Sequence, residues 1–500
     1  MSKIKFGWSE VSLIPEGAKV DLAGQFYERI TNEVESPLTV TALAMEGDGD
    51  SAIFCACDLV STSHVLLLTV RKYLEARPDV PADKVIVSAI HTHTGPGYAT
   101  RSDSTSISRG GGKGLDVLLE MMPDAKYETL VSYEGQDLFA GQEAHDYIAK
   151  QIADAAIKAW DARSEAIYAT GFGRAAIGLN RRVCYDDGSA KMWGDTFMAN
   201  FTELEAGNDS GIEMMFTYTP DKKLTGVIAN VACPAQVLEH RSFISSDYWG
   251  KVKERIRAKY GDDIFVLGLC SPAGDQCPRD LIRWVEPETP INDPNIVREN
   301  VPVRTADPSM FDLSGCKVAG RRIADEILYA LEDVTEYVSD TVLEHRTKML
   351  TLPLRRVTIE EKEAAEKAIK EFAANHEGTI NFVDKARMHI HAGVIARYRV
   401  QQEVNTVDIE VHFLRLGDIA FATNPYELFL NYGNQMRACS KAKQTFLIQL
   451  CCGSYGYLPT EKAEKGSHYS AYVSSGTVGH VAGDLLVRTT VQQINEMMDQ

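Results

Sequence analysis

The chain has 500 residues, of which 44% are apolar and 24% charged, as in an ordinary globular protein. Its net charge of −18 at pH 7 argues against nucleic acid or an anionic membrane as the main partner. The first residues lack the apolar core of a signal peptide, no apolar run is long enough to span a membrane, and the ten cysteines are spaced irregularly. These features predict a cytoplasmic protein with free thiols and no stable membrane association.

Strands and helices alternate in the first third of the sequence. Apolar, partly β-branched runs indicate buried strands, and an apolar helical period indicates helices. The expected elements are strands at 38–45, 51–60 and 85–90, a helix at 64–75 and a longer helix at 142–163. A strand, a helix and a strand in succession favour parallel pairing. The serine- and glycine-rich residues 98–140 interrupt this order, and we expect a mobile surface insertion there. Their glycines follow no strand and lack the phosphate-loop spacing, so a nucleotide site is not expected.

Similar elements continue to the C-terminus. They are strands at 224–233, 264–269 and 444–449, a hairpin at 407–422, and helices at 248–260, 320–332, 359–374, 384–400 and from 476 onward. No internal repeat and no linker is apparent. We therefore predict one α/β domain over residues 1–500, with a mixed, mainly parallel β-sheet core flanked by helices. Its active site is expected at the carboxyl ends of the strands.

His91 and His93 follow the expected strand at 85–90, directly before the turn Gly95-Pro96-Gly97. Residues two apart in an extended chain point to the same side, so these imidazoles can converge above the sheet edge. Imidazole serves in metal ligation and in proton transfer near neutral pH. The alternative is that both rings only form hydrogen bonds within a loop.

Other expected strand ends also finish in a polar residue beside a glycine or proline. They are Cys233, Ser271 with Asp275, Glu427 and Tyr457. Packing of the strands alone does not require so many polar residues at strand ends. A metal site that these residues share is the simplest arrangement that explains them. His, Cys and Glu are common zinc ligands, and a catalytic zinc keeps one position open. Taken singly, Cys233 is also consistent with a core thiol and Glu427 with a carboxylate at a helix start.

The segment His91-Thr92-His93-Thr94-Gly95-Pro96-Gly97 resembles the His-Thr-His-Ser-Gly-Pro signature of the neutral/alkaline, non-lysosomal ceramidases, which are zinc amidases. Five further blocks resemble this family and occur in its order: Asn180-Arg181, Ile244-Ser245-Ser246-Asp247, Ser271-x-Ala273-Gly274-Asp275, Pro425-x-Glu427 and Gly456-Tyr457-x-x-Thr460. Any one of these blocks alone is weak evidence for the family, whereas six blocks in the family's order are specific evidence for it. The chain thus resembles a divergent cytoplasmic member of the family.

The resemblance implies one zinc ion per chain, with His91, Glu427 and Tyr457 among its ligands. It also implies that His93 and Arg181 contact the substrate. Further active-site residues implied by the resemblance are Ser271, at the scissile amide, and Tyr469. Whether Ser271 attacks the amide or only positions it stays open, because no neighbouring residue in the sequence identifies its base.

One position departs from the family. Its second zinc histidine corresponds to Cys233, which is followed by Pro234. A thiolate there would hold zinc but leave less positive charge on it, so that a bound water would be less acidic. The resulting ligand set is His91, Cys233, Glu427 and Tyr457. In the alternative, Cys233 stays protonated and the ligand set is smaller, with Gln236 or His240 nearby.

Together these features predict a zinc-dependent hydrolase that cleaves a linear amide (N-acyl) bond through a metal-activated water. We expect a small polar substrate rather than membrane ceramide, because the chain is acidic and lacks the export signal and the C-terminal β-sandwich domain of the exported ceramidases. One alternative is a metal-dependent lyase or another sugar- or metabolite-processing enzyme. Another is a metal-free binding protein. A homo-oligomer is compatible with the sequence.

Two other histidine patterns are interpreted as structural. His389 and His391 lie in an expected helix, where residues two apart diverge by about 200°. His412 lies on an expected strand, and alternation turns it away from the apolar face, beside Glu410. We expect His412 to be a surface histidine with satisfied hydrogen bonds.

Overall fold

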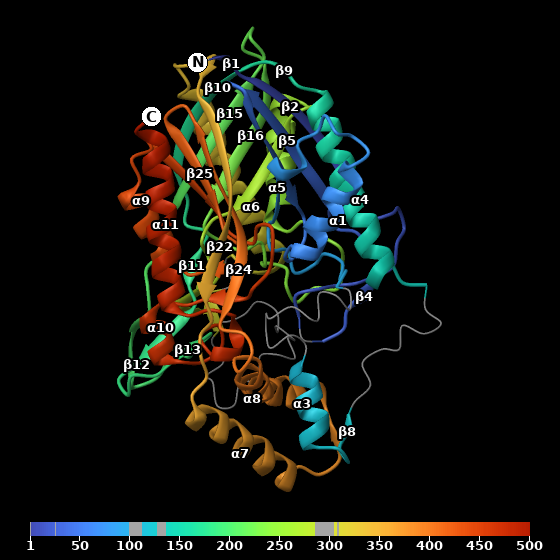
Figure 1. Ribbon diagram of the computed structural model, residues 1–500, viewed down its shortest axis with the longest axis vertical. Helices are drawn as coiled ribbons and strands as arrows, with labels where there is room; N and C mark the ends of the chain where they lie inside the picture. The colour runs from blue at the N-terminus through green and yellow to red at the C-terminus, as the bar shows by residue number, and fades with distance from the viewer. Residues whose placement is uncertain (1, 26, 100–112, 128–136, 286–304, 308–309) are drawn as a thin grey trace.

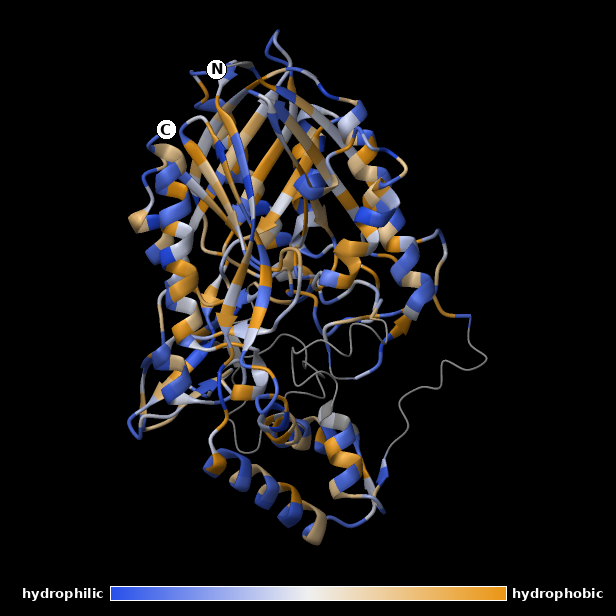
Figure 2. Ribbon diagram, viewed as in Figure 1, coloured by the Kyte–Doolittle hydropathy of each residue, from blue (hydrophilic) through white to orange (hydrophobic). Residues whose placement is uncertain are grey.

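The structure is a computed structural model that describes residues 2–25, 27–99, 113–127, 137–285, 305–307 and 310–500. Three β-sheets of four or five strands form the larger part of the molecule, and helices cover their outer faces (Figure 1). Apolar residues gather on the strands, and polar residues on the exposed sides of the helices (Figure 2). The expected α/β class is therefore confirmed.

The three sheets are built from consecutive stretches of the chain. The first contains β2 (Lys5–Ser12), β5 (Thr39–Gly47), β6 (Asp50–Cys57), β7 (Val85–Ala89) and β9 (Ser164–Glu165). The second contains β10 (Ile167–Arg174), β15 (Gly211–Tyr218), β16 (Leu224–Val231) and β17 (Phe265–Cys270). The third contains β22 (Leu343–Pro353), β24 (Thr406–Leu416), β25 (Ile419–Thr423) and β27 (Gln444–Ile448).

Each sheet contains a single parallel pair. In the second sheet, for example, β10, β15 and β16 pair antiparallel, and β17 lies parallel to β16. The parallel pairs β6–β7, β16–β17 and β25–β27 are each connected by a helix: α1 (His64–Leu74), α5 (Tyr248–Tyr260) and α9 (Leu430–Cys439). Antiparallel pairs outnumber parallel ones, so the mainly parallel pairing that we expected is corrected: the βαβ unit occurs once in each sheet and antiparallel neighbours make up the rest.

A long helix follows the parallel pair of each sheet and packs against the connecting helix. These helices are α4 (Gly141–Asp161) against α1, α6 (Asp312–Glu332) against α5, and α11 (His480–Met498) against α9. The same order of strands and helices thus occurs three times. The sequence analysis found no repeat, because the three units share an arrangement of apolar segments rather than a residue pattern.

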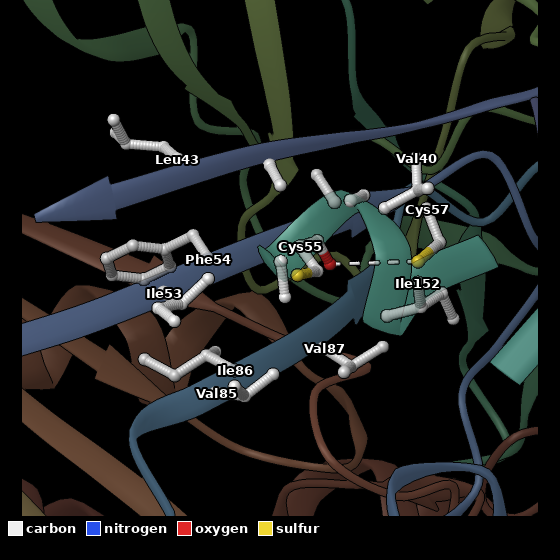
Figure 3. Close-up of a cluster of buried hydrophobic side chains, with 14 of the residues drawn as sticks. Val40, Leu43, Ile53, Phe54, Cys55, Cys57, Val85, Ile86, Val87 and Ile152 are labelled. Atoms are coloured by element: carbon white, nitrogen blue, oxygen red, sulfur yellow. Dashed lines mark hydrogen bonds between the residues drawn. The ribbon is translucent and has the colours of Figure 1, made fainter. Parts of the chain in front are cut away.

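The largest hydrophobic cluster lies between the sheets and draws side chains from all three of them, including Val87, Leu267 and Phe446. Strand β6 is buried on both faces, which explains its continuous apolar run without alternation. Figure 3 shows Phe54 and Cys55 of this strand beside Ile86 of β7. Burial of a side chain such as Ile86 contributes roughly 1.5–3 kcal/mol, so this contact region holds the strand ends firmly in place.

A smaller helical cluster lies below the sheets in Figure 1. It consists of α3 (Lys113–Met121), α7 (Ile359–Asn375) and α8 (Phe382–Val400), which share their own apolar contacts. Helix α3 belongs to the insertion expected at 98–140, of which residues 100–112 and 128–136 lie outside the described residues. His389 and His391 lie within α8, so their expected helical setting is confirmed.

Short elements complete the described part of the chain. They are β1 (Ser2–Lys3), β3 (Val20–Asp21), β4 (Ile30–Thr31), β8 (Lys126–Tyr127), β11 (Leu179–Asn180), β12 (Arg182–Tyr185), β13 (Ala190–Met192), β14 (Phe201–Leu204), β18 (Gln276–Cys277), β19 (Asp280–Val285), β20 (Thr305–Asp307), β21 (Asp340–Thr341), β23 (Thr379–Ile380), β26 (Glu427–Leu428), β28 (Tyr457–Leu458) and α10 (Glu461–Gly466). Among the helices described, none has the length and apolar character needed to cross a membrane.

Candidate functional site

His91 lies two residues beyond β7, and its backbone is left-handed, with φ of 69°. This turn, rather than alternation along an extended strand, brings its ring to His93, and their Nε2 atoms lie 3.2 Å apart. His91 Nδ1 lies 2.6 Å from the carbonyl oxygen of Val60. Because a carbonyl only accepts, Nδ1 carries the hydrogen and Nε2 carries the lone pair.

Glu427 and Tyr457 pair in the short parallel ladder of β26 and β28. Glu427 Oε2 lies 3.6 Å from His91 Nε2, and all three side chains are buried. Burial and the Glu427 carboxylate raise the pKa of the Tyr457 hydroxyl well above its usual value. Imidazole nitrogen and carboxylate oxygen are among the ligand types that zinc takes in proteins. His91, Glu427 and Tyr457 therefore form a donor set that fits a divalent metal ion.

Arg181 contacts this donor set from the second sheet's side. Its guanidinium Nη2 donates to the Gly274 carbonyl at 2.9 Å and lies 3.4 Å from the Tyr457 hydroxyl. The preceding Asn180 is held by its side-chain hydrogen bond to Asp275 at 2.9 Å. Arg181 is 4% exposed, and its Nε makes no hydrogen bond within the described residues. It is thus a buried cation with a donor left for a further acceptor. We call His91, His93, Arg181, Glu427 and Tyr457 the strand-end site.

His93 and the neighbouring Tyr469 are held by further contacts. His93 Nδ1 lies 3.5 Å from Glu239 Oε2. Gly24 contacts the same ring so closely, at φ of 99°, that an added Cβ would lie 2.5 Å from His93 Cγ. The Tyr469 ring meets Tyr457 edge-on, with centroids 5.6 Å apart.

Cys233 lies at the end of β16 and is completely buried. Its thiol donates to the Pro234 carbonyl at 3.5 Å, and burial raises its pKa well above the usual value. Within the described residues it does not join His91 and Glu427 in a set of ligand atoms lying within 4.8 Å of one another. To ligate with them, the thiol would have to turn from the Pro234 carbonyl. His240, named above as an alternative, stacks on Phe311.

Ser271 is held by a different set of residues. Its hydroxyl accepts a hydrogen bond from Arg437 Nη2 at 2.6 Å, and Arg437 also pairs with Asp209 at 3.0 Å. The hydroxyl is therefore engaged by α9 rather than by His91, Glu427 or Tyr457. This arrangement suits a residue that fixes the end of β17, and it identifies no base for nucleophilic attack.

Two residues beside the site escaped the sequence analysis. Cys277 ends β18 and is buried, and burial raises the pKa of its thiol to about 11, although the nearby Arg181 lowers it. Cys277 is a polar residue at a strand end, directly before Pro278. The same pattern identified the other positions, so the sequence contained the signal needed to find Cys277. Glu239, which faces His93, lies in a loop without such a signal.

A second cluster of ligand-type side chains consists of Glu410, His412 and Cys452, whose donor atoms lie within 4.8 Å of one another. We call it the Glu-His-Cys cluster. His412 is 1% exposed, so the expectation of a surface histidine was wrong: both faces of β24 are covered. Hydrogen bonds from Cys451 and the nearby His412 lower the pKa of Cys452 to about 5 despite burial. Burial disfavours a charged His412, but Cys452 and Glu410 raise its pKa to about 9.

Comparisons with known proteins bear on the fold. No family model matches the sequence, and no curated protein matches it. The neutral ceramidase from Pseudomonas aeruginosa matches over 100% of this chain and 75% of its own, with a TM-score of 0.67 and 14% identity. A ceramidase complexed with C2 matches over 100% of this chain and 76% of its own, with a TM-score of 0.65 and 13% identity. The chain therefore has a ceramidase-like fold.

Proposed function

We propose that the strand-end site is the active centre of a zinc-dependent hydrolase that cleaves a linear amide (N-acyl) bond. The observation that carries this proposal is the placement of a buried cation, Arg181, beside facing donors: its Nη2 lies 3.4 Å from the Tyr457 hydroxyl, and Glu427 Oε2 lies 3.6 Å from His91 Nε2. Metal-assisted acyl transfer needs both a donor set for the metal and a group that stabilises negative charge on the reacting oxygen.

His91, Glu427 and Tyr457 would hold the zinc, and Cys233 is proposed as a further ligand after its thiol turns from Pro234. The fixed tautomer of His91 supports this assignment, because its Nε2 lone pair faces the Glu427 carboxylate. In such a setting zinc polarises a carbonyl and activates water. The ceramidase-like fold and the order of the resembling blocks favour amide hydrolysis over the lyase alternative.

The remaining residues are given roles by their contacts. The Arg181 guanidinium stabilises negative charge that develops on the carbonyl oxygen, because its unused Nε is a preorganised donor in a buried setting. His93, oriented by Glu239, holds and delivers the proton that the departing amine needs. Tyr469 is placed to contact the substrate beside Tyr457. Ser271 positions the end of β17 through Arg437.

A small, polar N-acyl compound is the proposed substrate class. The net charge of −18 disfavours approach to an anionic membrane surface, where an N-acyl lipid would have to be extracted. The buried Arg181 guanidinium and the two histidines of the strand-end site suit a substrate with polar groups on both sides of the amide.

The first experiment measures metal content by elemental mass spectrometry on protein purified without chelator, for the wild type, His91→Ala and Cys233→Ala. The same proteins are assayed for amine release from N-acyl amino acids, N-acyl amino sugars and short- and long-chain N-acylsphingosines. A zinc content in His91→Ala that is lower than in the wild type by about one ion per chain, together with amine release from a polar amide, is the expected result.

The control is His376→Ala, a histidine at the end of α7. It should keep both zinc and activity. A zinc content in Cys233→Ala equal to that of the wild type would remove Cys233 from the ligand set. Hydrolysis of N-acylsphingosines alone would overturn the polar substrate. A wild type that binds no metal and releases no amine would overturn the hydrolase proposal in favour of a binding protein.

A further inference from the structure

The Glu-His-Cys cluster lies where the first and third sheets meet. Glu410 and His412 are two residues apart on β24, so both side chains lie on one face of that strand. Cys452 follows β27, and its backbone nitrogen donates to the Val87 carbonyl of β7 at 2.8 Å. All three side chains are at least nine-tenths buried. Residues from separate parts of the chain are thus brought together across a junction between sheets.

A chain of hydrogen bonds fixes the tautomer of His412. His345 Nδ1 lies 2.8 Å from the Ser51 carbonyl, so this nitrogen carries a hydrogen. His345 Nε2 then accepts, and its partner at 2.9 Å is His412 Nδ1, which must donate. The lone pair of a neutral His412 is therefore on Nε2. That atom lies 2.9 Å from Glu410 Oε1 and 3.6 Å from Cys452 Sγ.

An imidazole lone pair, a carboxylate oxygen and a sulfur therefore face one another without water. Such a group is stable only with a positive charge among its members, either a proton on His412 Nε2 or a metal ion. We propose that the Glu-His-Cys cluster is a structural metal site for a zinc-like divalent cation, distinct from the strand-end site and independent of the function proposed for it.

The separations suit that ion. Bond lengths of about 2.0 Å to nitrogen or oxygen and 2.3 Å to sulfur place neighbouring ligand atoms of tetrahedral zinc roughly 3.3–3.8 Å apart. The His412–Cys452 separation of 3.6 Å lies in this range, and the His412–Glu410 separation of 2.9 Å needs to open by only a few tenths of an ångström. Cys451 Sγ, 3.8 Å from Cys452 Sγ, lies nearby as a donor for a fourth position after a side-chain rotation.

The residues that are hydrogen-bonded to His412 and Glu410 resemble those that hold the ligands of metal sites in other proteins. Ligating histidines in proteins usually donate their second nitrogen to a fixed acceptor, as His412 does to His345. Arg71 of α1 holds Glu410 through two hydrogen bonds, at 2.6 and 2.8 Å. Each carboxylate oxygen has two lone pairs, so Oε1 can accept from Arg71 and still bind an ion. The mixed sulfur, nitrogen and oxygen donors favour zinc over magnesium or calcium.

The test uses Co²⁺ as a spectroscopic substitute for zinc on the full-length chain after removal of metals. Tetrahedral Co²⁺ bound to a thiolate gives a sulfur-to-metal charge-transfer band in the near ultraviolet, which reports cysteine ligation independently of activity. Wild type, Cys452→Ser and His412→Gln are titrated, with circular dichroism to verify folding. His91→Ala and Cys233→Ser serve as controls for the strand-end site, and Cys439→Ser as a control for an exposed cysteine.

We expect a thiolate band in the wild type and in the three control variants. Because Cys233 is itself a proposed ligand, the decisive variants are made in the Cys233→Ser background, where adding Cys452→Ser should abolish the band and adding His412→Gln should weaken it. Zinc should also raise the melting temperature of His91→Ala, but not of His91→Ala combined with Cys452→Ser. If Cys452→Ser does not fold, the intensity of the Co²⁺ band and the effect of zinc on the melting temperature are measured in His412→Gln instead. No band in the wild type would overturn the proposal and would indicate a proton on His412 Nε2 in place of the ion. A band that disappears in Cys233→Ser, or that persists when Cys452→Ser is added to Cys233→Ser, would also overturn it.

Discussion

The strand-end site and the Glu-His-Cys cluster use similar residues in different settings. In the strand-end site a main-chain carbonyl fixes His91, and Arg181 retains an unused donor. In the cluster Arg71 occupies both oxygens of Glu410, and a second histidine fixes His412. Histidine beside a carboxylate therefore does not by itself define a catalytic centre. The difference is whether, among the described residues, a polar donor remains for another molecule.

The backbone contributes to this difference. His91, Glu427 and Tyr457 lie on turns and very short strands beyond the sheets, where each can be set independently. Glu410 and His412 lie within the eleven-residue strand β24, which pairs on both sides. Loops positioned by a rigid scaffold suit binding and chemistry, whereas a closed arrangement between strands suits a structural role.

Removal of the His91 imidazole should have the largest effect. His91→Ala should lower kcat/KM for the cleaved amide by on the order of a thousandfold, because several kcal/mol of metal-assisted stabilisation are lost. Steady-state kinetics with purified variants measure the change. Activity close to that of the wild type would remove His91, and the strand-end site with it, from the reaction.

Arg71→Met should destabilise the fold rather than the reaction. Glu410 would be left buried without its cation, which costs about 3 kcal/mol. Urea unfolding without added metal measures the loss. Arg77→Met, which breaks exposed ion pairs of α1's flanking turn, is the matched control and should leave the unfolding midpoint nearly unchanged. Equal midpoints for Arg71→Met and the wild type would show that the cluster does not depend on this pairing.

Substitution of the neighbouring Arg181 and Arg182 should affect different properties: the reaction rate for Arg181 and the stability of the fold for Arg182. Arg181→Lys should lower kcat/KM roughly a hundredfold with little change in melting temperature, because a lysine cannot reproduce the directed guanidinium donors. Arg182→Lys should instead lower the melting temperature, because Arg182 is fully buried and pairs with Glu205 at 2.7 Å. Kinetics and thermal unfolding of both variants give the comparison. The reverse pattern would contradict the role assigned to Arg181.

The smallest effect concerns pH. Burial and the charges of Arg182 and Lys191 lower the pKa of His468 to about 4, and its Nδ1 accepts from the Met192 amide at 3.1 Å. Between pH 6.5 and 4 the unfolded chain therefore binds a proton that the folded chain does not, so stability falls as the pH falls through this range. At pH 5 the loss should be about 1 kcal/mol after allowance for partial exposure.

His468→Gln keeps an acceptor for Met192 but cannot titrate. The difference in unfolding free energy between pH 7 and pH 5 should therefore be smaller in this variant than in the wild type. Urea unfolding at the two pH values measures it. An identical pH dependence would mean that His468 does not control stability in this range.

The sequence alone determined the kind and approximate position of many elements. The expected helix at 248–260 coincides with α5, the run at 51–60 covers β6 except for Asp50, and the run at 85–90 contains β7. These predictions hold because apolar periodicity and glycine or proline turns act over a few neighbouring residues. Local pattern also placed His91, Glu427 and Tyr457 beyond strand ends.

Tertiary structure decided which of these ends meet. The pairings β11–β18 and β26–β28 place Arg181 beside Gly274, and Glu427 beside Tyr457, through contacts between distant segments. The same long-range packing turned His412 into the core, engaged Ser271 with Arg437 and created the threefold order of sheets and helices. None of these outcomes follows from local pattern, because side-chain burial and partners depend on how whole sheets pack against one another.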